Sequence, residues 1–271
     1  MRNYWRLGSR YIKLVRGNNK WGVWEMIATL WNISTGVIDY YLNPFAEKQK
    51  NLPPARLQKI RADMEDSGLQ VSPYRINVAD FRGWLDRATF PKEYADSYGS
   101  LFVEKALEHY IGAQLLDLQA GDTFIDVAAA HSPWFEIAER LYGITTYALD
   151  LSFSPGIQLK KIGADATATP LPDAFASKMA LHCAYEMFEG DADIRLIPEA
   201  ERVLAPGGRM VILPLYMHNF YFADSSPLAN RRRLDYQGAV RVWPSPAVLL
   251  DFHGNTLYLP LWKEWCLTSV L

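Results

Sequence analysis

The feature that most constrains the fold is a regular alternation of strand-like and helix-like patterns between residues 122 and 216. Short apolar, β-branched runs are separated by segments with apolar residues at helical spacing. Such alternation predicts a parallel sheet with crossover helices, so the expected fold class is α/β, a Rossmann-like, mostly parallel doubly wound sheet. Ligands of such sheets bind outside the carboxyl ends of the strands, where the strand order reverses. We predict strands near 123–127, 145–150, 177–182 and 209–215, and helices near 134–142 and 192–204.

The first predicted strand leads into an unusual turn, DVAAAHSPW, at residues 126–134. A nucleotide-binding fold carries glycines in this turn, because glycine permits positive φ and a close approach of the ligand to the backbone. Ala128, Ala130 and Ser132 occupy the three places where glycine is expected. Alanine and serine are the smallest substitutes, so they narrow the access of a ligand without abolishing it. Two interpretations stay open: a cofactor turn with replaced glycines, and an ordinary strand–helix turn.

Composition and turn residues divide the 271 residues into an N-terminal extension and a larger domain. Residues 1–78 form a basic and aromatic extension, and residues 79–271 form the α/β domain. Within this domain we predict a helical cap over 79–118, a ligand-binding core over 119–216 and a C-terminal hairpin region over 217–271.

Local signals predict details of the cap and of the C-terminal region. Asp80 is the expected N-cap of the first cap helix. Two apolar runs, AVLLDF and TLYLPLW, flank a turn in which Gly254 and Asn255 supply the left-handed positions. This pattern predicts a C-terminal antiparallel hairpin that closes an otherwise parallel sheet.

The net charge of −2 is unevenly distributed. Residues 1–24 contain six arginines or lysines and no acidic residue, so their charge of +6 leaves −8 for the rest of the chain. Tyrosines and tryptophans interleave these cations. The pattern fits docking on an anionic membrane surface or on a protein partner, and it also fits a solvated basic helix whose aromatic side chains pack on the main domain. Nucleic acid is disfavoured, because the acidic balance elsewhere offers no broad phosphate-binding face.

The remaining composition predicts a cytoplasmic protein, with peripheral association with a membrane through residues 1–24 as an alternative. Cys183 and Cys266 are too few for a disulfide framework and form no zinc-type pair, so we expect both to be buried apolar side chains and expect no metal site. The basic start lacks the apolar core of a signal peptide. The apolar run MIATLWNISTGVI is interrupted by polar residues, which predicts a core helix rather than a membrane span.

Four motifs follow one another between residues 121 and 216: GDTFIDVAAAHSP, TTYALDLS, GADATATPLPDAF and EAERVLAPGGRMVILPLY. Their order resembles that of the class I S-adenosylmethionine-dependent methyltransferases of the type 11 group, with a degenerate Gly-rich first motif. The resemblance implies S-adenosylmethionine as the cofactor. The cofactor-binding residues that it implies are Asp126, Ala128, Ala130 and Ser132 in the first motif, Asp150 and Leu151 after the second strand, Asp165 and Ala166 beside the adenine, and His182.

Asp150 is the residue whose spacing supports this site most directly. It ends the second predicted strand and lies 24 residues after Asp126. An acidic residue about 20 positions beyond the turn is well placed to accept both hydroxyls of a ribose. The alternative is that Asp150 is only an N-cap or turn residue.

Methyl transfer from a sulfonium is an in-line displacement, so positioning provides most of the catalysis. A hydroxyl or amine acceptor must also lose a proton, for which a histidine or a carboxylate is suited. The expected catalytic residues are His182 and His218, which follow consecutive predicted strands, and Glu186. Tyr185 is a further candidate for lining the acceptor pocket, whereas the helical position of His109 does not suggest catalysis.

The leading hypothesis is therefore S-adenosylmethionine-dependent methyl transfer to a small-molecule O or N acceptor. The alternative is a methyltransferase-like binding or scaffold protein that has lost catalysis, which the missing glycines favour. From backbone entropy alone, restoring glycine at Ala128 and Ala130 is expected to lower stability slightly and to leave cofactor affinity equal or tighter.

Overall fold

The computed structural model describes residues 23–42, 54–185, 188, 191–215, 222–224, 240–242 and 257–259. The chain divides into two compact units, one of residues 1–63 with 218–262 and the other of residues 64–217 with 263–271. Within the described parts of the chain, no helix is both long enough and apolar enough to cross a membrane. The first unit contains α2 (Val23–Leu42), most of α3 (Pro54–Asp66), and a three-stranded sheet of β6 (Phe222–Asp224), β7 (Val240–Val242) and β8 (Leu257–Leu259) in the order β7-β6-β8.

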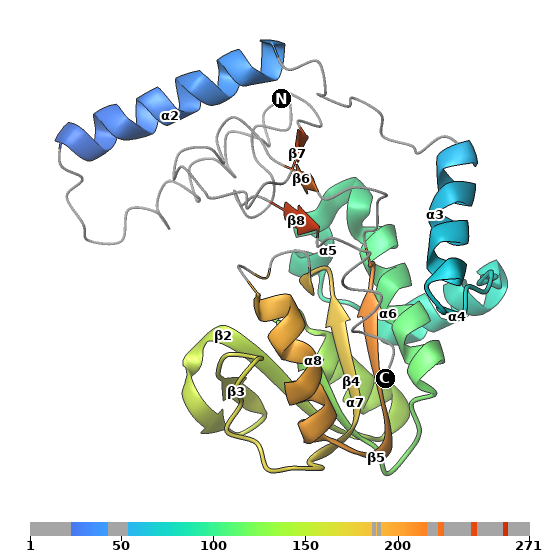
Figure 1. Cartoon of the computed structure of the whole chain (residues 1–271). Coiled ribbons are helices and arrows are strands. Elements are labelled where there is room, and N and C mark those ends of the chain that lie inside the picture. Colours follow the sequence, from blue (N-terminus) through green and yellow to red (C-terminus); the bar gives the residue numbers. More distant parts are fainter. Residues whose placement is uncertain are drawn as a thin grey trace. The chain divides into compact units, whose positions relative to one another are not determined.

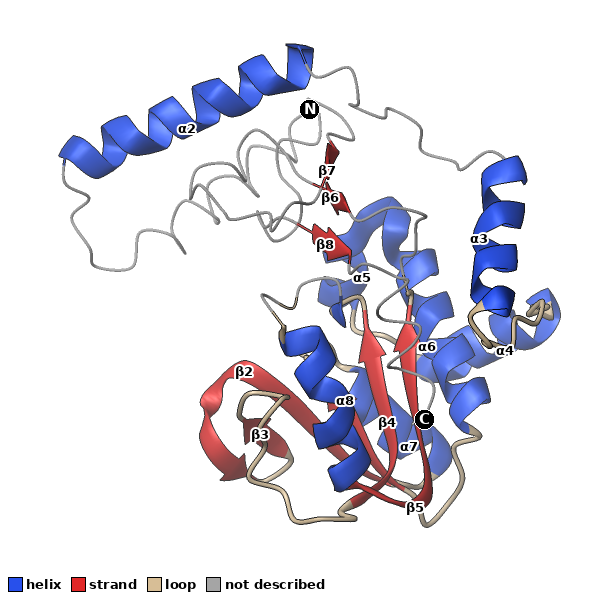
Figure 2. Cartoon of the chain, in the orientation of Figure 1, coloured by secondary structure: helices blue, strands red, loops and turns tan. Residues whose placement is uncertain are grey.

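The second unit carries the parallel sheet that the sequence predicts (Figure 2). Its strand order is β3-β2-β1-β4-β5, and every strand pair in it is parallel. The order runs outward in two directions and reverses between β1 and β4, which defines a Rossmann-like doubly wound sheet. The strands are β1 (Thr123–Val127), β2 (Thr145–Gln158), β3 (Lys161–Gly163), β4 (Ala176–His182) and β5 (Leu204–Leu213), and the helices are α4 (Val78–Ala88), α5 (Lys92–Tyr98), α6 (Phe102–Leu116), α7 (Trp134–Tyr142) and α8 (Ala192–Val203), with a 3-10 turn at Gly99–Leu101.

Both faces of this sheet are covered, so its central strands are apolar on both sides. Successive side chains of β1 alternate between two cores, because a strand has a period of two. Ile125 and Val127 pack in the core that includes residues of α8, whereas Phe124 packs in the core that includes residues of α4, α6 and α7. Figure 1 shows α8 on one face of the sheet and α7 on the other.

The helix that follows β1 forms where the amphipathic pattern predicts it. Trp134, Phe135, Ile137 and Ala138 are its buried residues. It ends at Gly143, which has a φ of 64° and donates its N–H to the carbonyl of Glu139. A left-handed glycine is a frequent end of a helix, since it closes the last turn without a Cβ clash.

Two expectations about the ends of elements are wrong. Among the described residues no antiparallel hairpin extends the five-stranded sheet, and the antiparallel pair β6 with β8 belongs to the separate three-stranded sheet, in which β6 is paired on both sides. The turn expected at Gly254 and Asn255 lies outside the described residues. Asn77, not Asp80, caps α4, because its extended backbone lets its side-chain oxygen accept the N–H groups of Ala79 and Asp80 at 3.0 and 3.3 Å.

Candidate active site

The turn after β1 adopts the backbone conformation that glycines would supply. Ala128 has a φ of 55° and Ala130 a φ of 45°, both in the left-handed region. The Ala129 N–H between them donates to the carbonyl of Leu149 at 3.1 Å, which ties the turn to β2. The Ser132 hydroxyl accepts the N–H of Trp134 at 3.2 Å, at the start of α7. The alanines therefore preserve the path of a Gly-rich turn at the point where the strand order reverses.

Asp150 lies beside this turn, as its spacing of 24 residues after Asp126 predicts. One carboxylate oxygen accepts the Ala130 N–H at 2.8 Å, and the other accepts the Ser152 N–H at 2.8 Å. Asp150 thus stabilises the turn, which is the structural role left open from the sequence. Its side chain remains half-buried at the carboxyl edge of the sheet, and the neighbouring Leu151 is exposed.

The loop that holds Asp165 and Ala166 follows β3. The Asp165 carboxylate accepts the N–H of Thr167 at 2.8 Å, which forms a local turn, while Ala166 is buried in the core on the α8 side. The Thr167 hydroxyl in turn accepts a hydrogen bond from Arg195 of α8 at 2.7 Å. This loop is therefore bound to α8 by side-chain contacts as well as by packing.

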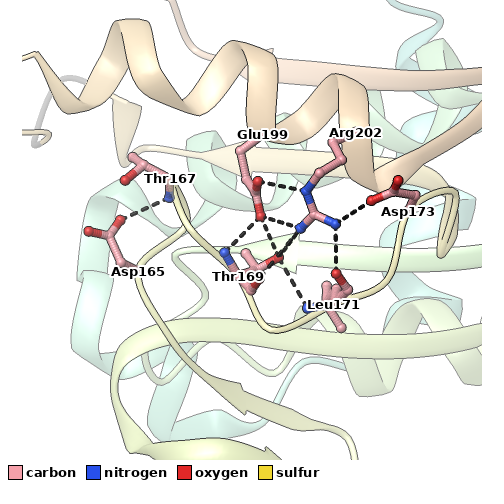
Figure 3. A network of polar contacts seen from close by, with 7 residues as sticks. All are labelled: Asp165, Thr167, Thr169, Leu171, Asp173, Glu199 and Arg202. Atoms are coloured by element: carbon pink, nitrogen blue, oxygen red, sulfur yellow. Dashed lines mark hydrogen bonds and ion pairs between the residues drawn. The ribbon is translucent and has the colours of Figure 1, made fainter.

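A second group of contacts fixes the end of the same loop (Figure 3). The Arg202 guanidinium of α8 binds the Asp173 carboxylate at 2.7 Å and the Leu171 carbonyl at 2.8 Å. Arg202 also donates to Glu199, which accepts both the N–H and the hydroxyl of Thr169 at 2.7 Å. The hydrogen bond from Arg202 lowers the pKa of Glu199 to about 2, so this carboxylate stays charged at neutral pH.

Asp126 and His182 form a buried acid–histidine pair at the ends of β1 and β4. Asp126 lies opposite Ala180 in the register, so Asp126 and His182 are diagonal neighbours on one face of the sheet. The His182 Nδ1 lies 3.4 Å from an Asp126 oxygen, and the two side chains are 6% and 2% exposed. Burial raises the pKa of the Asp126 carboxyl, and the hydrogen bond to His182 partly opposes this rise. The His182 Nε2 faces α6 where Gly112 lies, since a Cβ there would meet this nitrogen at 2.8 Å.

His109 of α6 belongs to the same buried group, although its position on a helix did not suggest a role in the site. Its ring centroid is 4.4 Å from that of His182, and it stacks on Trp134 at 4.9 Å. The Tyr94 hydroxyl of α5 lies 3.3 Å from its Nε2. Burial and the nearby His182 hold the pKa of His109 well below its usual range. The one sequence signal was a histidine inside the apolar stripe that includes Ala106, where a hydrophobic residue is expected.

The expectation that Cys183 is a buried apolar side chain is wrong. Cys183 is half-buried, follows His182 with a φ of 50°, and accepts a hydrogen bond from Lys105 of α6. Its thiol donates to Glu108 at 2.7 Å, and Lys105 and Glu108 are themselves 3.1 Å apart. Burial raises the pKa of the Cys183 thiol to about 12, and the hydrogen bond to Glu108 adds to the rise. This thiol is therefore a neutral member of a polar network, not an activated nucleophile.

The remaining residues predicted for the acceptor side of the site are Glu186, His218 and Tyr185. Glu186 and His218 lie outside the described residues. Tyr185 is buried, and its hydroxyl donates to the Asp193 carbonyl at 3.1 Å, so it belongs to the core and not to an acceptor pocket. The described residues contain no group of histidine, cysteine, aspartate or glutamate side chains arranged to hold a metal ion.

Comparison with known proteins finds similarity only among solved structures. No family model matches the chain, and no curated protein matches it. The chain is similar to a structure of the Haloferax volcanii Trm112 methyltransferase activator with a methyltransferase, at 16% identity, over 48% of this chain and 58% of that one, with a TM-score of 0.35. A methyltransferase structure from Bacillus halodurans C-125 gives 19% identity over 39% and 50% of the two chains, with a TM-score of 0.34. A SAM-dependent methyltransferase structure from Aquifex aeolicus gives 13% identity over 51% and 72%, with a TM-score of 0.34.

The descriptions of these three structures name a methyltransferase in each case. The chain spans only 58% and 50% of the first two matched structures. The Rossmann-like assignment itself rests on the strand order and on the reversal between β1 and β4.

Proposed function

We propose that this chain binds S-adenosylmethionine at the carboxyl edge of the parallel sheet and transfers its methyl group to a small-molecule O or N acceptor. The observation that carries the proposal is the pair of left-handed alanines, Ala128 and Ala130, beside the Asp150 carboxylate. A non-glycine residue in this conformation costs about 1–2 kcal/mol. Such strain concentrates at ligand sites, where the surrounding structure holds it in place.

Asp150 keeps the capacity to bind a ribose while it stabilises the turn. An ionised carboxylate offers about four lone-pair sites. Two of them accept the N–H groups of Ala130 and Ser152, one on each oxygen. One lone-pair direction on each oxygen therefore remains for the two adjacent hydroxyls of a ribose.

The rest of the edge also suits this cofactor. S-adenosylmethionine has no pyrophosphate, so the turn does not have to wrap an anion tightly, and the methyl groups of Ala128 and Ala130 are tolerable. When bound, the cofactor supplies an electrophilic methyl group. We assign Asp165 and Ala166 to the adenine end, since the loop that carries them is fixed by the Thr167 and Arg195 contacts.

We assign the role of general base to His182. The Asp126 carboxylate next to Nδ1 favours the tautomer with its proton on that nitrogen, which leaves the Nε2 lone pair to accept a proton from a hydroxyl or amine. Both side chains are almost completely buried and Nε2 faces Gly112 of α6, so this role requires α6 to move away from the His182 ring when the acceptor binds. Exclusion of water strengthens electrostatic interactions at the reacting atoms and prevents side reactions.

Titration calorimetry of the purified full chain with S-adenosylmethionine, and separately with its demethylated product, tests the binding step. The Asp150→Asn variant is expected to bind about 10-fold to 100-fold more weakly, the range for losing hydrogen bonds to a charged group. Glu136→Gln is the matched control, because Glu136 is an exposed carboxylate on α7 near the turn. Absence of binding by the natural chain would overturn the proposal and leave the scaffold interpretation.

The catalytic step is tested by release of the demethylated cofactor in the presence of small hydroxyl and amine acceptors. His182→Ala is expected to lower turnover by at least about tenfold while cofactor affinity stays unchanged, because a general base contributes about 10²–10⁴-fold to the rate. Normal turnover by His182→Ala would remove this residue from the mechanism and leave the binding proposal intact.

A further inference from the structure

The strongest unassigned feature is the exposed face of α2 in the first unit. Placed at about 100° per residue, the exposed side chains among those that the structure describes in this 20-residue helix fall within about 160° of its circumference. Trp24 and Trp31 are 81% and 70% exposed, and both lie on this face. We call this set the α2 apolar face, and its large members are Val23, Trp24, Ile27, Leu30, Trp31, Ile38 and Leu42.

The α2 apolar face has almost no polar side chains among those that the structure describes. At helical spacing it contains no charged residue, and the Ser34 hydroxyl on it donates to the Leu30 carbonyl at 2.8 Å, inside its own helix. A helix of this length is about 30 Å long. Contiguous apolar surface of such extent marks a surface that binds a partner or a membrane.

The chain that precedes α2 indicates the chemistry of that partner. Residues 1–22 carry six arginines and lysines, and the first acidic residue is Glu25. A surface that attracts these cations and also accepts apolar and tryptophan side chains is an anionic lipid surface, where tryptophan is favoured at the headgroup level. A second copy of this chain would bring two +6 segments together, which like-charge repulsion opposes.

We propose that α2 lies in the plane of an anionic membrane surface, with its apolar face toward the acyl chains and residues 1–22 among the headgroups. In this proposal the helix lies on the membrane surface and does not cross the bilayer. This proposal is independent of methyl transfer, since it uses no residue of the candidate active site.

Flotation of the full chain with lipid vesicles tests the proposal. The chain should float with vesicles that contain about 30% phosphatidylglycerol and not with pure phosphatidylcholine, and raising the salt from about 0.1 M to about 0.5 M should release much of it. The double variant Trp24→Ser/Trp31→Ser should bind at least about tenfold more weakly, since it removes two large apolar side chains from the contact. Both tryptophans are exposed, so the variant should fold, which circular dichroism checks.

A matched control changes exposed apolar residues of the second unit. Leu159→Ser/Val103→Ser alters side chains that are 95% and 56% exposed and should bind vesicles as the natural chain does. A charge variant, Arg10→Gln/Arg16→Gln, should lose part of the binding at low salt. Equal binding of the tryptophan variant and the natural chain would overturn the proposal. So would binding to neither vesicle, or a concentration-dependent dimer in light scattering that the tryptophan variant abolishes.

Discussion

Replacing Ala130 by glycine should stabilise the protein, because the φ of 45° at this position is one that alanine adopts only at a cost. Release of left-handed strain is worth about 1–2 kcal/mol, and the greater backbone freedom of glycine in the unfolded chain offsets about 0.4–1 kcal/mol of it. Ala130 is exposed, so little packing is lost with its methyl group. The net gain is about 0.5–1 kcal/mol. This sign is opposite to the one that backbone entropy alone predicts.

Thermal unfolding followed by circular dichroism measures the change. For a domain of 150–250 residues, a gain of about 0.5–1 kcal/mol raises Tm by about 1–4 °C. Ala129→Gly is the internal control, since Ala129 has no positive φ and is buried at 5% exposure. It should lower stability by about 1–2 kcal/mol, through backbone entropy and a lost buried methyl group. If both variants were destabilised alike, the left-handed turn and the strain argument would be refuted.

Gly112→Ala should destabilise the protein by about 1–3 kcal/mol, because the new Cβ would lie 2.8 Å from the Nε2 of His182 and displace that ring. Gly83→Ala is the control in chemical denaturation and should be neutral or stabilising, since its Cβ would meet only the end of one flexible side chain. The buried His109 should make the protein less stable below pH of about 6.5, since its native pKa is lowered and the unfolded chain then binds the extra proton. His109→Phe, which keeps the stacking on Trp134, should flatten the loss of stability between about pH 6.5 and pH 5 in urea titrations, and an unchanged slope would contradict the assignment.

The core of the fold could be predicted because its signals are local. Short apolar, β-branched runs locate β1, β4 and the start of β2, and the spacing between Asp126 and Asp150 places both at the same edge of the sheet. The strand predicted near 145–150 extends to Gln158 in the structure. The extension was not predicted because the sequence SFSPGIQ has no alternation that would mark it as a strand. Sequence spacing therefore located the turn and its acidic neighbour, but not the length of the second strand.

The buried part of the site could not be predicted, because it depends on packing between distant elements. His109 and His182 are 73 positions apart, and their rings meet only because α6 packs against β4 and β5. The polar partners of Cys183 likewise come from α6, 75 and 78 positions earlier. The positive φ values of Ala128 and Ala130 were also hidden, since alanine in a sequence carries no sign of a left-handed backbone.

For the proposed cofactor, the Arg202 network would lower the entropic cost of binding at the loop that we assign to the adenine end. Because its contacts hold the loop from Thr169 to Asp173 in one conformation before any ligand arrives, a ligand there orders little further backbone. Ordering a free loop would cost about 1–2 kcal/mol for each residue. A substitution on α8 that releases Arg202 would therefore weaken binding through loop entropy alone, with no contact to the ligand lost. Affinity at this edge is consequently a property of α8 as well as of the residues that touch the ligand.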